Sequence, residues 1–312
     1  MKAARSSEAA GLDKLRSLEE IFRSYGRVLV AFSGGADSAF VLKVAREVLG
    51  KENVLAVIAK SPSLPASELE EARAVASEID APLVEIETRE LDNPNYTANP
   101  VNRCYFCKTE LYSHLAPLAR ELGFSHIVNG TNQDDLGDWR PGLKAAQENQ
   151  IKSPLVEAGF TKKEIREASQ QLGLSTWSKP QAACLSSRIP FGMDVTPERL
   201  EQVEQSEAVL KNLGFEVVRL RWFDKNAQIE VGPDETRIFF QDAEIREKVF
   251  AQLKNLGFET VELNLQGYRT GRFNPTSSLR GGAFRHPEAP KGPKDLEILR
   301  FAQDDGVRQV AQ

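Results

Sequence analysis

A short apolar strand that runs into a glycine-containing turn and then a helix constrains the fold more than any other feature. The run Val28–Phe32 is too short for a helix and is typical of a buried parallel strand. Ser33, Gly34 and Gly35 follow it, and an amphipathic helix begins near Ser38. Glycines let backbone N–H groups approach a ligand, and a helix N-terminus behind such a turn attracts anions. The segment therefore predicts a phosphate-binding loop, although an ordinary strand–turn–helix junction has the same pattern.

Strand-like and helix-like segments alternate from residue 14 to about 180. The predicted strands are 28–32, 54–59, 83–86 and 126–129, with helices over 38–49, 66–79 and 107–122. This order predicts an α/β domain in which helices cover both faces of a parallel sheet. Ligands of such sheets lie beyond the carboxyl ends of the strands, where the loops 33–38, 88–99 and 130–138 fall. We therefore expect one site assembled from three loops.

The pattern changes after Pro197. Helices over 198–213 and 242–256, with strands over 216–222, 227–231 and 260–265, predict a small α+β domain. The sequence LKNLGFE occurs at both helix ends, which favours a duplicated half-unit of ferredoxin-like type whose first strand is not evident. From about residue 281 the composition turns to Arg, Gly, Pro, Lys and Asp, which predicts disorder.

Length, charge and cysteine content narrow the possible partners. The 312 residues carry a formal net charge of −5, with a sequence pI near 5.5, which argues against a broad basic face for nucleic acid. The N-terminus lacks the apolar core of a signal peptide, and no run approaches the roughly 20 apolar residues of a membrane span. We expect a cytoplasmic protein without a nucleic-acid or membrane partner.

The three cysteines lie in two motifs and indicate thiol or metal chemistry rather than a disulfide framework. Cys104 and Cys107 form a Cys-x-x-Cys pair, which alone is compatible with zinc, a redox pair, an iron–sulfur cluster or simple burial. Structural zinc usually has four protein ligands, and His114 and His126 are the only nearby histidines. With Cys184, three thiolates without a good fourth ligand resemble a four-iron four-sulfur cluster with one open iron. Reactive thiols without iron remain an alternative.

Charged residues complete the candidate site. Asp37 follows the glycines and can bind a magnesium ion carried by ATP, although acidic residues near helix N-termini are also common caps. Arg219 and Arg221 alternate on a predicted strand, so both point to one face, and Arg188 follows Cys184 by four residues. Guanidinium groups bind phosphate and carboxylate bidentately, although surface arginines on strands are often only solubilising.

The phosphate loop, SGGADS, lacks the lysine that a Walker A loop requires after its last glycine. It resembles the PP-loop of the ATP pyrophosphatases. In that superfamily the loop holds the pyrophosphate of ATP, AMP is transferred to an oxygen of the substrate, and a nucleophile then displaces the AMP. The resemblance implies a PP-loop, adenine nucleotide α-hydrolase-like fold. We therefore predict a flexible N-terminus over 1–13, a PP-loop domain over 14–195, a small α+β substrate or oligomerisation domain over 196–274 and a disordered tail over 275–312.

Six motifs in order resemble the LarE family of ATP-dependent sulfur transferases, over residues 14 to about 274. They are SGGADS, NRCYFCK, GTNQDDLGDWRPGL, SPLVEAGFTKKEIR, WSKPQAACLSSRIPFG and LQGYRTGRFN. The resemblance implies that the protein adenylates a carboxylate of pyridinium-3,5-biscarboxylic acid mononucleotide. Sulfur then attacks the acyl-adenylate and gives a thiocarboxylate, in the biosynthesis of the nickel-pincer nucleotide cofactor.

The same resemblance implies roles for individual residues. Cys184 would carry the sulfur and Asp37 would bind Mg²⁺, with both counted as catalytic alongside two of the residues below. The expected pyrophosphate ligands are Ser33, Gly34, Gly35 and Ser38. The expected ligands of the substrate phosphate and carboxylates are Ser187, Arg188, Arg219 and Arg221, with looser matches at Tyr105, Glu207 and Glu230.

The family has a one-cysteine version that sacrifices its sulfur and a three-cysteine version that binds an iron–sulfur cluster. The three cysteines imply the second version, in which Cys104, Cys107 and Cys184 hold the cluster and sulfide or another sulfur donor supplies the sulfur. A homo-oligomer is also expected. Two other functions remain open at this point: a tRNA-thiolating PP-loop enzyme, which the net charge disfavours, and a non-catalytic adenine nucleotide-binding protein.

Overall fold

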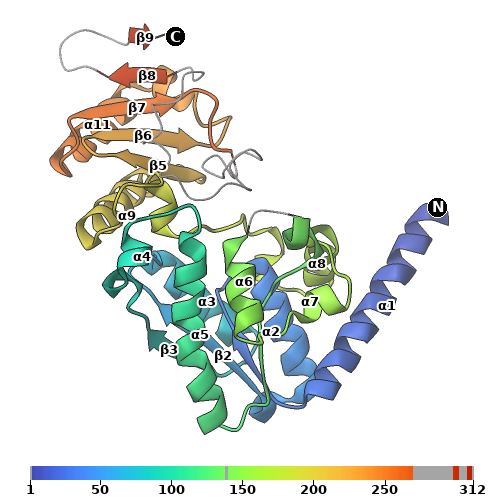
Figure 1. Ribbon diagram of the computed structural model, residues 1–312. Coiled ribbons are helices and arrows are strands. Elements are labelled where there is room, and N and C mark those ends of the chain that lie inside the picture. The colour runs from blue at the N-terminus through green and yellow to red at the C-terminus, as the bar shows by residue number, and fades with distance from the viewer. Residues whose placement is uncertain (1, 138–139, 270–297, 302–307, 311–312) are drawn as a thin grey trace. The chain divides into compact units, whose positions relative to one another are not determined.

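Two separate β-sheets organise the chain, and each belongs to its own unit (Figure 1). The computed structural model describes residues 2–137, 140–269, 298–301 and 308–310. The first unit contains the residues up to Asn93 together with Asn102–Ala183. The second contains Pro94–Val101 and the residues from Cys184 onward.

The first unit is built on four parallel strands. They are β1 (Val28–Ala31), β2 (Val54–Lys60), β3 (Leu83–Glu87) and β4 (His126–Val128), in the order β3-β2-β1-β4. Strand β1 is central, and Val28 is aligned with both Val54 and His126. Continuous apolar runs such as Val28–Ala31 suit strands that are buried on both faces. The predicted parallel sheet is confirmed.

Helices cover both faces of this sheet because successive residues of β1 point to opposite sides. Val28 and Val30 join a core formed with α1 (Lys2–Tyr25), α2 (Ala36–Leu49), α3 (Ala66–Glu78), α7 (Pro154–Glu157) and α8 (Lys162–Gln171). Leu29 joins a second core with α5 (Arg103–Glu121) and α6 (Pro141–Glu148). Thr161 and Glu164 close a capping box at the start of α8. The predicted PP-loop architecture is confirmed.

Helix α1 differs from the flexible N-terminus that the sequence predicts for residues 1–13. The helix begins at Lys2 and continues to Tyr25, and its later turns bury Leu18 and Phe22 in the first core. Ala and Glu, which are strong helix formers, are frequent in its first turns, so the buried part can propagate the helix backward. Of the helices that the structure describes, none is long and apolar enough to cross a membrane.

The second unit has a mixed sheet. Strand β5 (Val218–Phe223) is antiparallel to β6 (Asn226–Val231), and β6 is parallel to β7 (Thr260–Asn264). The helices are α4 (Pro94–Thr97), α9 (Pro197–Asn212), α10 (Ile238–Gln241) and α11 (Ala243–Asn255). The two LKNLGFE repeats form the same turn after α9 and after α11. In each repeat the glycine has a positive φ, 94° at Gly214 and 100° at Gly257, which favours this residue.

The segment Pro94–Val101 belongs to the second unit although it interrupts the first in sequence. Asn99 is fully buried and its side-chain amide donates to the carbonyls of Ile189, Pro190 and Met193, at 3.2, 2.8 and 2.9 Å. Tyr96 Oη also lies 2.7 Å from Ser186 Oγ. These contacts explain why the units divide at Ala183 and Cys184, while the predicted domains meet at 195 and 196.

Two short strands lie in the segment 275–312, for which the sequence predicts disorder. Strand β8 (Ile298–Phe301) pairs antiparallel with β7, and β9 (Arg308–Val310) pairs with β8. These residues therefore extend the second sheet, which differs from the prediction, because the apolar cluster near Leu296–Phe301 supplies a strand-like run. The rest of that segment lies outside the described residues.

Candidate functional site

The phosphate loop joins β1 to α2 by a backbone that only glycine accommodates. Gly34 has a φ of 68°, and a Cβ atom built on it would lie 2.6 Å from the Cβ of Ala72 on α3. Gly35 precedes the first helical residue, and no side chain caps α2 there. A Cβ on Gly130, in the loop after β4, would lie 2.8 Å from the Ser38 nitrogen. Two further segments therefore approach the start of α2 closely.

Two hydroxyl groups fix the shape of this loop. Ser33 Oγ and Ser38 Oγ lie 3.0 Å apart, and the Ser33 N–H donates to Ser38 Oγ at 3.3 Å. Ser38 Oγ also donates to the Gly35 carbonyl at 3.1 Å, and the Ser38 residue is buried. Ser38 therefore holds the turn in addition to its predicted contact with pyrophosphate.

Asp37 lies in the first turn of α2, beside the loop that follows β4. Its Oδ2 accepts a hydrogen bond from Asn132 Nδ2 at 3.2 Å. Asp135, in the same loop as Asn132, is buried and pairs with Arg140 at 2.9 Å and with Lys162 at 3.0 Å. The structure thus brings the predicted loops 33–38 and 130–138 together at the carboxyl ends of β1 and β4.

Asp37 should behave as a functional residue that costs stability. Burial raises its pKa above the usual value, and the neighbouring Asp135 carboxylate adds to this. An acid with a raised folded-state pKa contributes stability below its unfolded pKa and loses that contribution as pH rises through the folded pKa. At neutral pH we therefore expect Asp37→Asn to slow adenylation and to raise the melting temperature, with a smaller gain in acid.

A matched control is Asp80, whose pKa is lowered by hydrogen bonds from Lys51 and Arg46. Its stabilising contribution is present above the unfolded pKa and is lost as pH falls, so Asp80→Asn should not stabilise the protein at neutral pH. Thermal unfolding of both variants across this pH range provides the measurement. A lower melting temperature for Asp37→Asn at neutral pH would contradict the interpretation.

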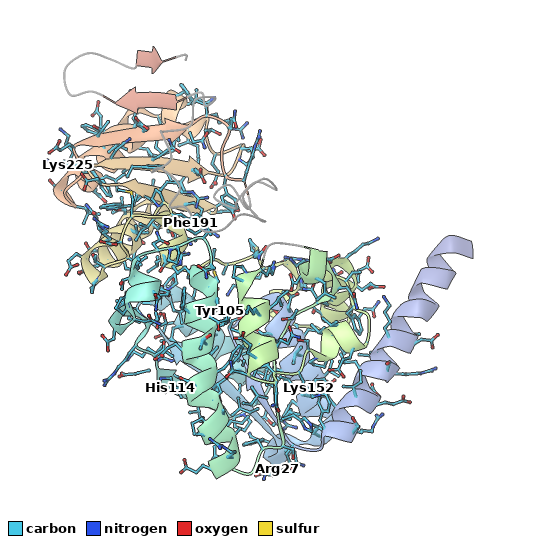
Figure 2. All side chains as sticks on the ribbon, viewed as in Figure 1. Arg27, Tyr105, His114, Lys152, Phe191 and Lys225 are labelled. Carbon is cyan, nitrogen blue, oxygen red and sulfur yellow. The ribbon has the colours of Figure 1, made fainter. Side chains whose placement is uncertain are left out.

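The Cys-x-x-Cys pair lies at the beginning of α5. Cys104 is exposed, Cys107 is partly buried, and both are free thiols. Three residues apart on a helix, they share one side of α5. Tyr105 lies between them in sequence, and its hydroxyl donates to Glu148 on α6 at 2.7 Å (Figure 2). The structure therefore gives Tyr105 a contact between two helices of the first unit, in addition to its predicted role with substrate.

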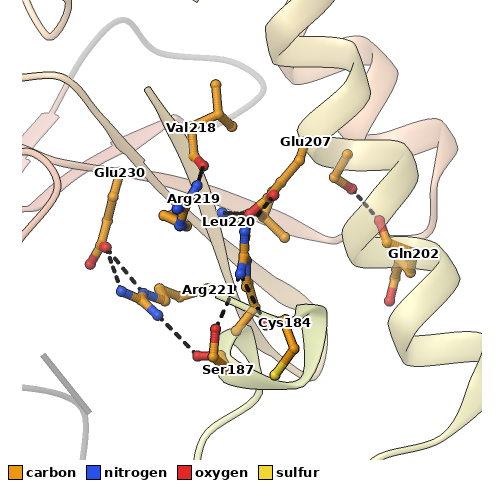
Figure 3. Close-up of polar contacts among 11 residues, drawn as sticks. Cys184, Ser187, Gln202, Glu207, Val218, Arg219, Leu220, Arg221 and Glu230 are labelled. Carbon is orange, nitrogen blue, oxygen red and sulfur yellow. Dashed lines mark hydrogen bonds and ion pairs between the residues drawn. The ribbon is translucent and has the colours of Figure 1, made fainter. Parts of the chain in front are cut away.

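Cys184 belongs to the second unit and precedes a short 3₁₀ helix, Leu185–Arg188. Its thiol is free and partly exposed. Arg188 is buried and forms a bidentate ion pair with Glu207 of α9, at 2.8 and 2.9 Å (Figure 3). Arg188 Nη1 also donates to the Cys184 carbonyl at 3.0 Å and to Ser187 Oγ at 3.1 Å. The backbone that carries the Cys184 thiol is thus tied to a buried charge pair.

Strand β5 brings two more arginines to this cluster. Arg221 donates to the Ser187 carbonyl at 3.0 Å and pairs with Glu230 of β6 at 2.9 Å (Figure 3). Arg219 donates to the Val218 carbonyl at 2.7 Å, and its guanidinium lies 4.9 Å from the centre of the Tyr268 ring. The alternation on the strand places Arg219 and Arg221 on one face of the sheet, as expected.

The cluster carries three arginines and two buried glutamates, which leaves an excess of positive charge. Burial lowers the pKa of Arg188, but Glu207 more than offsets this, so the pKa is raised overall. Burial and the nearby charge of Arg188 lower the pKa of Arg219. The mutual repulsion of these cations favours a bound anion.

The structure divides the predicted site residues between the two units. Those of the first unit are Ser33, Gly34, Gly35, Asp37, Ser38, Cys104, Tyr105 and Cys107, and those of the second are Cys184, Ser187, Arg188, Glu207, Arg219, Arg221 and Glu230. Among the described residues, no group of three or more His, Cys, Asp or Glu side chains is arranged to hold a metal ion. Sequence reasoning missed Lys179, whose Nζ lies 3.4 Å from the Gly34 carbonyl. Its only signal is its position in the motif that contains Cys184.

Comparisons with known proteins agree with this geometry. A family model described as NAD synthase matches residues 16–98, which include the phosphate loop. The pyridinium-3,5-bisthiocarboxylic acid mononucleotide synthase of Lactiplantibacillus plantarum is 37% identical over 263 residues, covering 84% of this chain and 94% of that protein. An uncharacterized protein of a Synechocystis species is 47% identical, over 84% of this chain and 97% of that protein. One from Methanocaldococcus jannaschii is 29% identical, over 83% and 97%.

Proposed function

Because the chain belongs to the family of the pyridinium-3,5-bisthiocarboxylic acid mononucleotide synthase and is an ATP-dependent sulfur-transferring enzyme of PP-loop type, we propose that it acts on the same substrate. It adenylates a carboxylate of pyridinium-3,5-biscarboxylic acid mononucleotide and replaces a carboxylate oxygen by sulfur. The observation that carries the proposal is Cys184, attached to a buried cluster of arginines in a chain that also has a lysine-free phosphate loop.

The chemistry requires two displacements. In the first, a carboxylate oxygen bonds to the α-phosphorus of ATP, and the bond from that phosphorus to the bridging oxygen breaks. Pyrophosphate leaves with the electron pair. In the second, sulfur bonds to the carboxyl carbon and AMP leaves, because adenylation has made it a good leaving group.

The residues divide this work by their chemistry. The loop Ser33–Ser38 offers backbone N–H groups and the N-terminus of α2 to the pyrophosphate, and Asp37 offers a carboxylate to the magnesium ion that ATP carries. Arg219 and Arg221, with Ser187 and Arg188, hold the phosphate and carboxylate groups of the substrate. Cys184 carries the sulfur.

We also propose that the three cysteines hold an iron–sulfur cluster. Cys104 and Cys107 are free and one helical turn apart, a spacing that suits two ligands of one cluster, and Cys184 is the third thiolate that the chain contains. When bound, the cluster would supply an open iron for an external sulfide. Iron and acid-labile sulfide measured after anaerobic reconstitution test this, and protein that binds no iron would contradict it.

The products of ATP distinguish the proposed function from ordinary phosphate hydrolysis. A loop with glycines and Asp37 but no Walker lysine should direct cleavage to the bond between the α and β phosphates. Incubation with Mg²⁺, ATP and the pyridinium dicarboxylate should yield AMP and pyrophosphate, measured by chromatography. Accumulation of ADP and orthophosphate instead would refute the proposal.

A further inference from the structure

A buried lysine from a distant part of the chain lies behind the phosphate loop. Lys179 follows the 3₁₀ helix Ser175–Ser178, and its Nζ lies 3.4 Å from the carbonyl oxygen of Gly34, 145 residues away in sequence. Its side chain is 14% exposed and also pairs with Glu68 and Glu71 of α3, at 2.8 Å each. The loop itself contains no lysine.

Helix α3 contacts the phosphate loop in two ways. Ala72 lies against Gly34 so closely that a Cβ on the glycine would be 2.6 Å from the Ala72 Cβ. Glu68 and Glu71 share a side of α3 with Ala72, because residues three and four apart on a helix are neighbours. Through Lys179 these two carboxylates reach the Gly34 carbonyl. The loop is therefore supported from α3 both by packing and by charge.

The segment that carries Lys179 is fixed as well. Arg166 of α8 donates to the carbonyls of Trp177 and Lys179, at 2.9 and 2.8 Å. Burial lowers the pKa of Lys179, but Glu68 and Glu71 more than offset it, so the pKa is raised overall. The ammonium group therefore stays charged at neutral pH. Its two carboxylate partners make it a poor direct ligand for phosphate, because they already balance its charge.

The contact with Gly34 determines the orientation of one peptide plane. In a trans peptide the carbonyl of Gly34 and the N–H of Gly35 point in opposite directions within one rigid plane. We propose that Lys179 is a positioning residue for the phosphate loop: its ammonium group holds the Gly34 carbonyl behind the loop and thereby turns the Gly35 N–H toward the β- and γ-phosphates of ATP. The positive φ of Gly34 makes this plane free to rotate without such a contact.

This inference rests on the proposed use of ATP at the loop, and its test requires no sulfur transfer. The probes are Mg-ATP and AMP, titrated separately by calorimetry in the absence of a substrate carboxylate. Lys179→Met should weaken ATP binding roughly five- to twentyfold, the effect of one charge-assisted hydrogen bond, because ATP needs the loop. AMP lacks the β- and γ-phosphates, so its affinity should change little. Failure of the parent protein to bind ATP would contradict the proposed function instead.

Two further variants make the result decisive. Lys179→Arg keeps a cationic donor and should recover part of the ATP affinity, whereas Lys163→Met removes an exposed lysine of α8 and should change neither affinity. Equal losses of ATP and AMP affinity in Lys179→Met, or no loss of either, would overturn the proposal. If neither substitution at Lys179 yields folded protein, the residue serves the fold rather than the loop, and the proposal is equally overturned.

Discussion

Cys184→Ala is expected to abolish thiocarboxylate formation while leaving the formation of AMP and pyrophosphate in place. Sulfur is required only for the second displacement, so the acyl-adenylate can still form without it. The fold should persist, because Arg188 is bonded to the Cys184 carbonyl, which alanine retains, and not to the thiol. Product analysis by mass spectrometry, with thermal unfolding as the control, provides the measurement. Sulfur transfer by Cys184→Ala at the parent rate would contradict this role.

Cys104→Ala separates the two possible sources of the sulfur. If the three cysteines hold a cluster, this variant should lose repeated turnover with added sulfide. If Cys184 gives up its own sulfur, Cys104→Ala should support one turnover per chain as the parent does, and Cys184 should lose the mass of one sulfur. The second outcome, with no iron bound, would refute the proposed cluster.

Arg221→Ala is expected to destabilise the protein and to weaken substrate binding. Arg221 is 5% exposed and Glu230 is fully buried, so removal of the arginine leaves an uncompensated carboxylate in the interior. Breaking a buried pair in this way costs about 3–5 kcal/mol. Loss of a charge-assisted contact with the substrate should also lower affinity roughly ten- to a hundredfold. Urea unfolding and calorimetric titration measure the two effects.

A double variant separates stability from binding. Arg221→Met with Glu230→Gln removes both charges, and the glutamine keeps an oxygen for the hydrogen bond from Asn264. Much of the lost stability should return, because no unpaired charge remains. Substrate affinity should stay low, and ATP binding should match the parent in every variant. Normal substrate binding by this double variant would exclude Arg221 from the substrate site.

The phosphate loop and its sheet could be predicted from sequence because their signals are local. The predicted strand 28–32 corresponds to β1, Val28–Ala31, and the predicted helix 38–49 to α2, Ala36–Leu49. A buried parallel strand is a continuous apolar run, and the glycine turn marks its end. The alternation of Arg219 and Arg221 likewise follows from the period of a strand.

The remaining parts depend on contacts between residues that are distant in sequence. The pairing of Arg188 with Glu207 and the position of Lys179 behind Gly34 follow from the packing of separate helices, which no local pattern records. The inclusion of Pro94–Val101 in the second unit depends on Asn99 reaching three distant carbonyls. Helix α1 was missed because residues before Leu18 have little apolar periodicity, and packing of the later turns stabilises the whole helix.

The central claim is that ATP cleavage drives replacement of a carboxylate oxygen by sulfur. Its most direct test is an anaerobic incubation of the full chain with Mg²⁺, ATP, sulfide and pyridinium-3,5-biscarboxylic acid mononucleotide, followed by mass spectrometry of the pyridinium product. We predict the mass change of an oxygen-to-sulfur exchange, with one AMP formed for each sulfur inserted. A substrate of unchanged mass after AMP has formed, or a thiocarboxylate that appears without AMP, would contradict the claim.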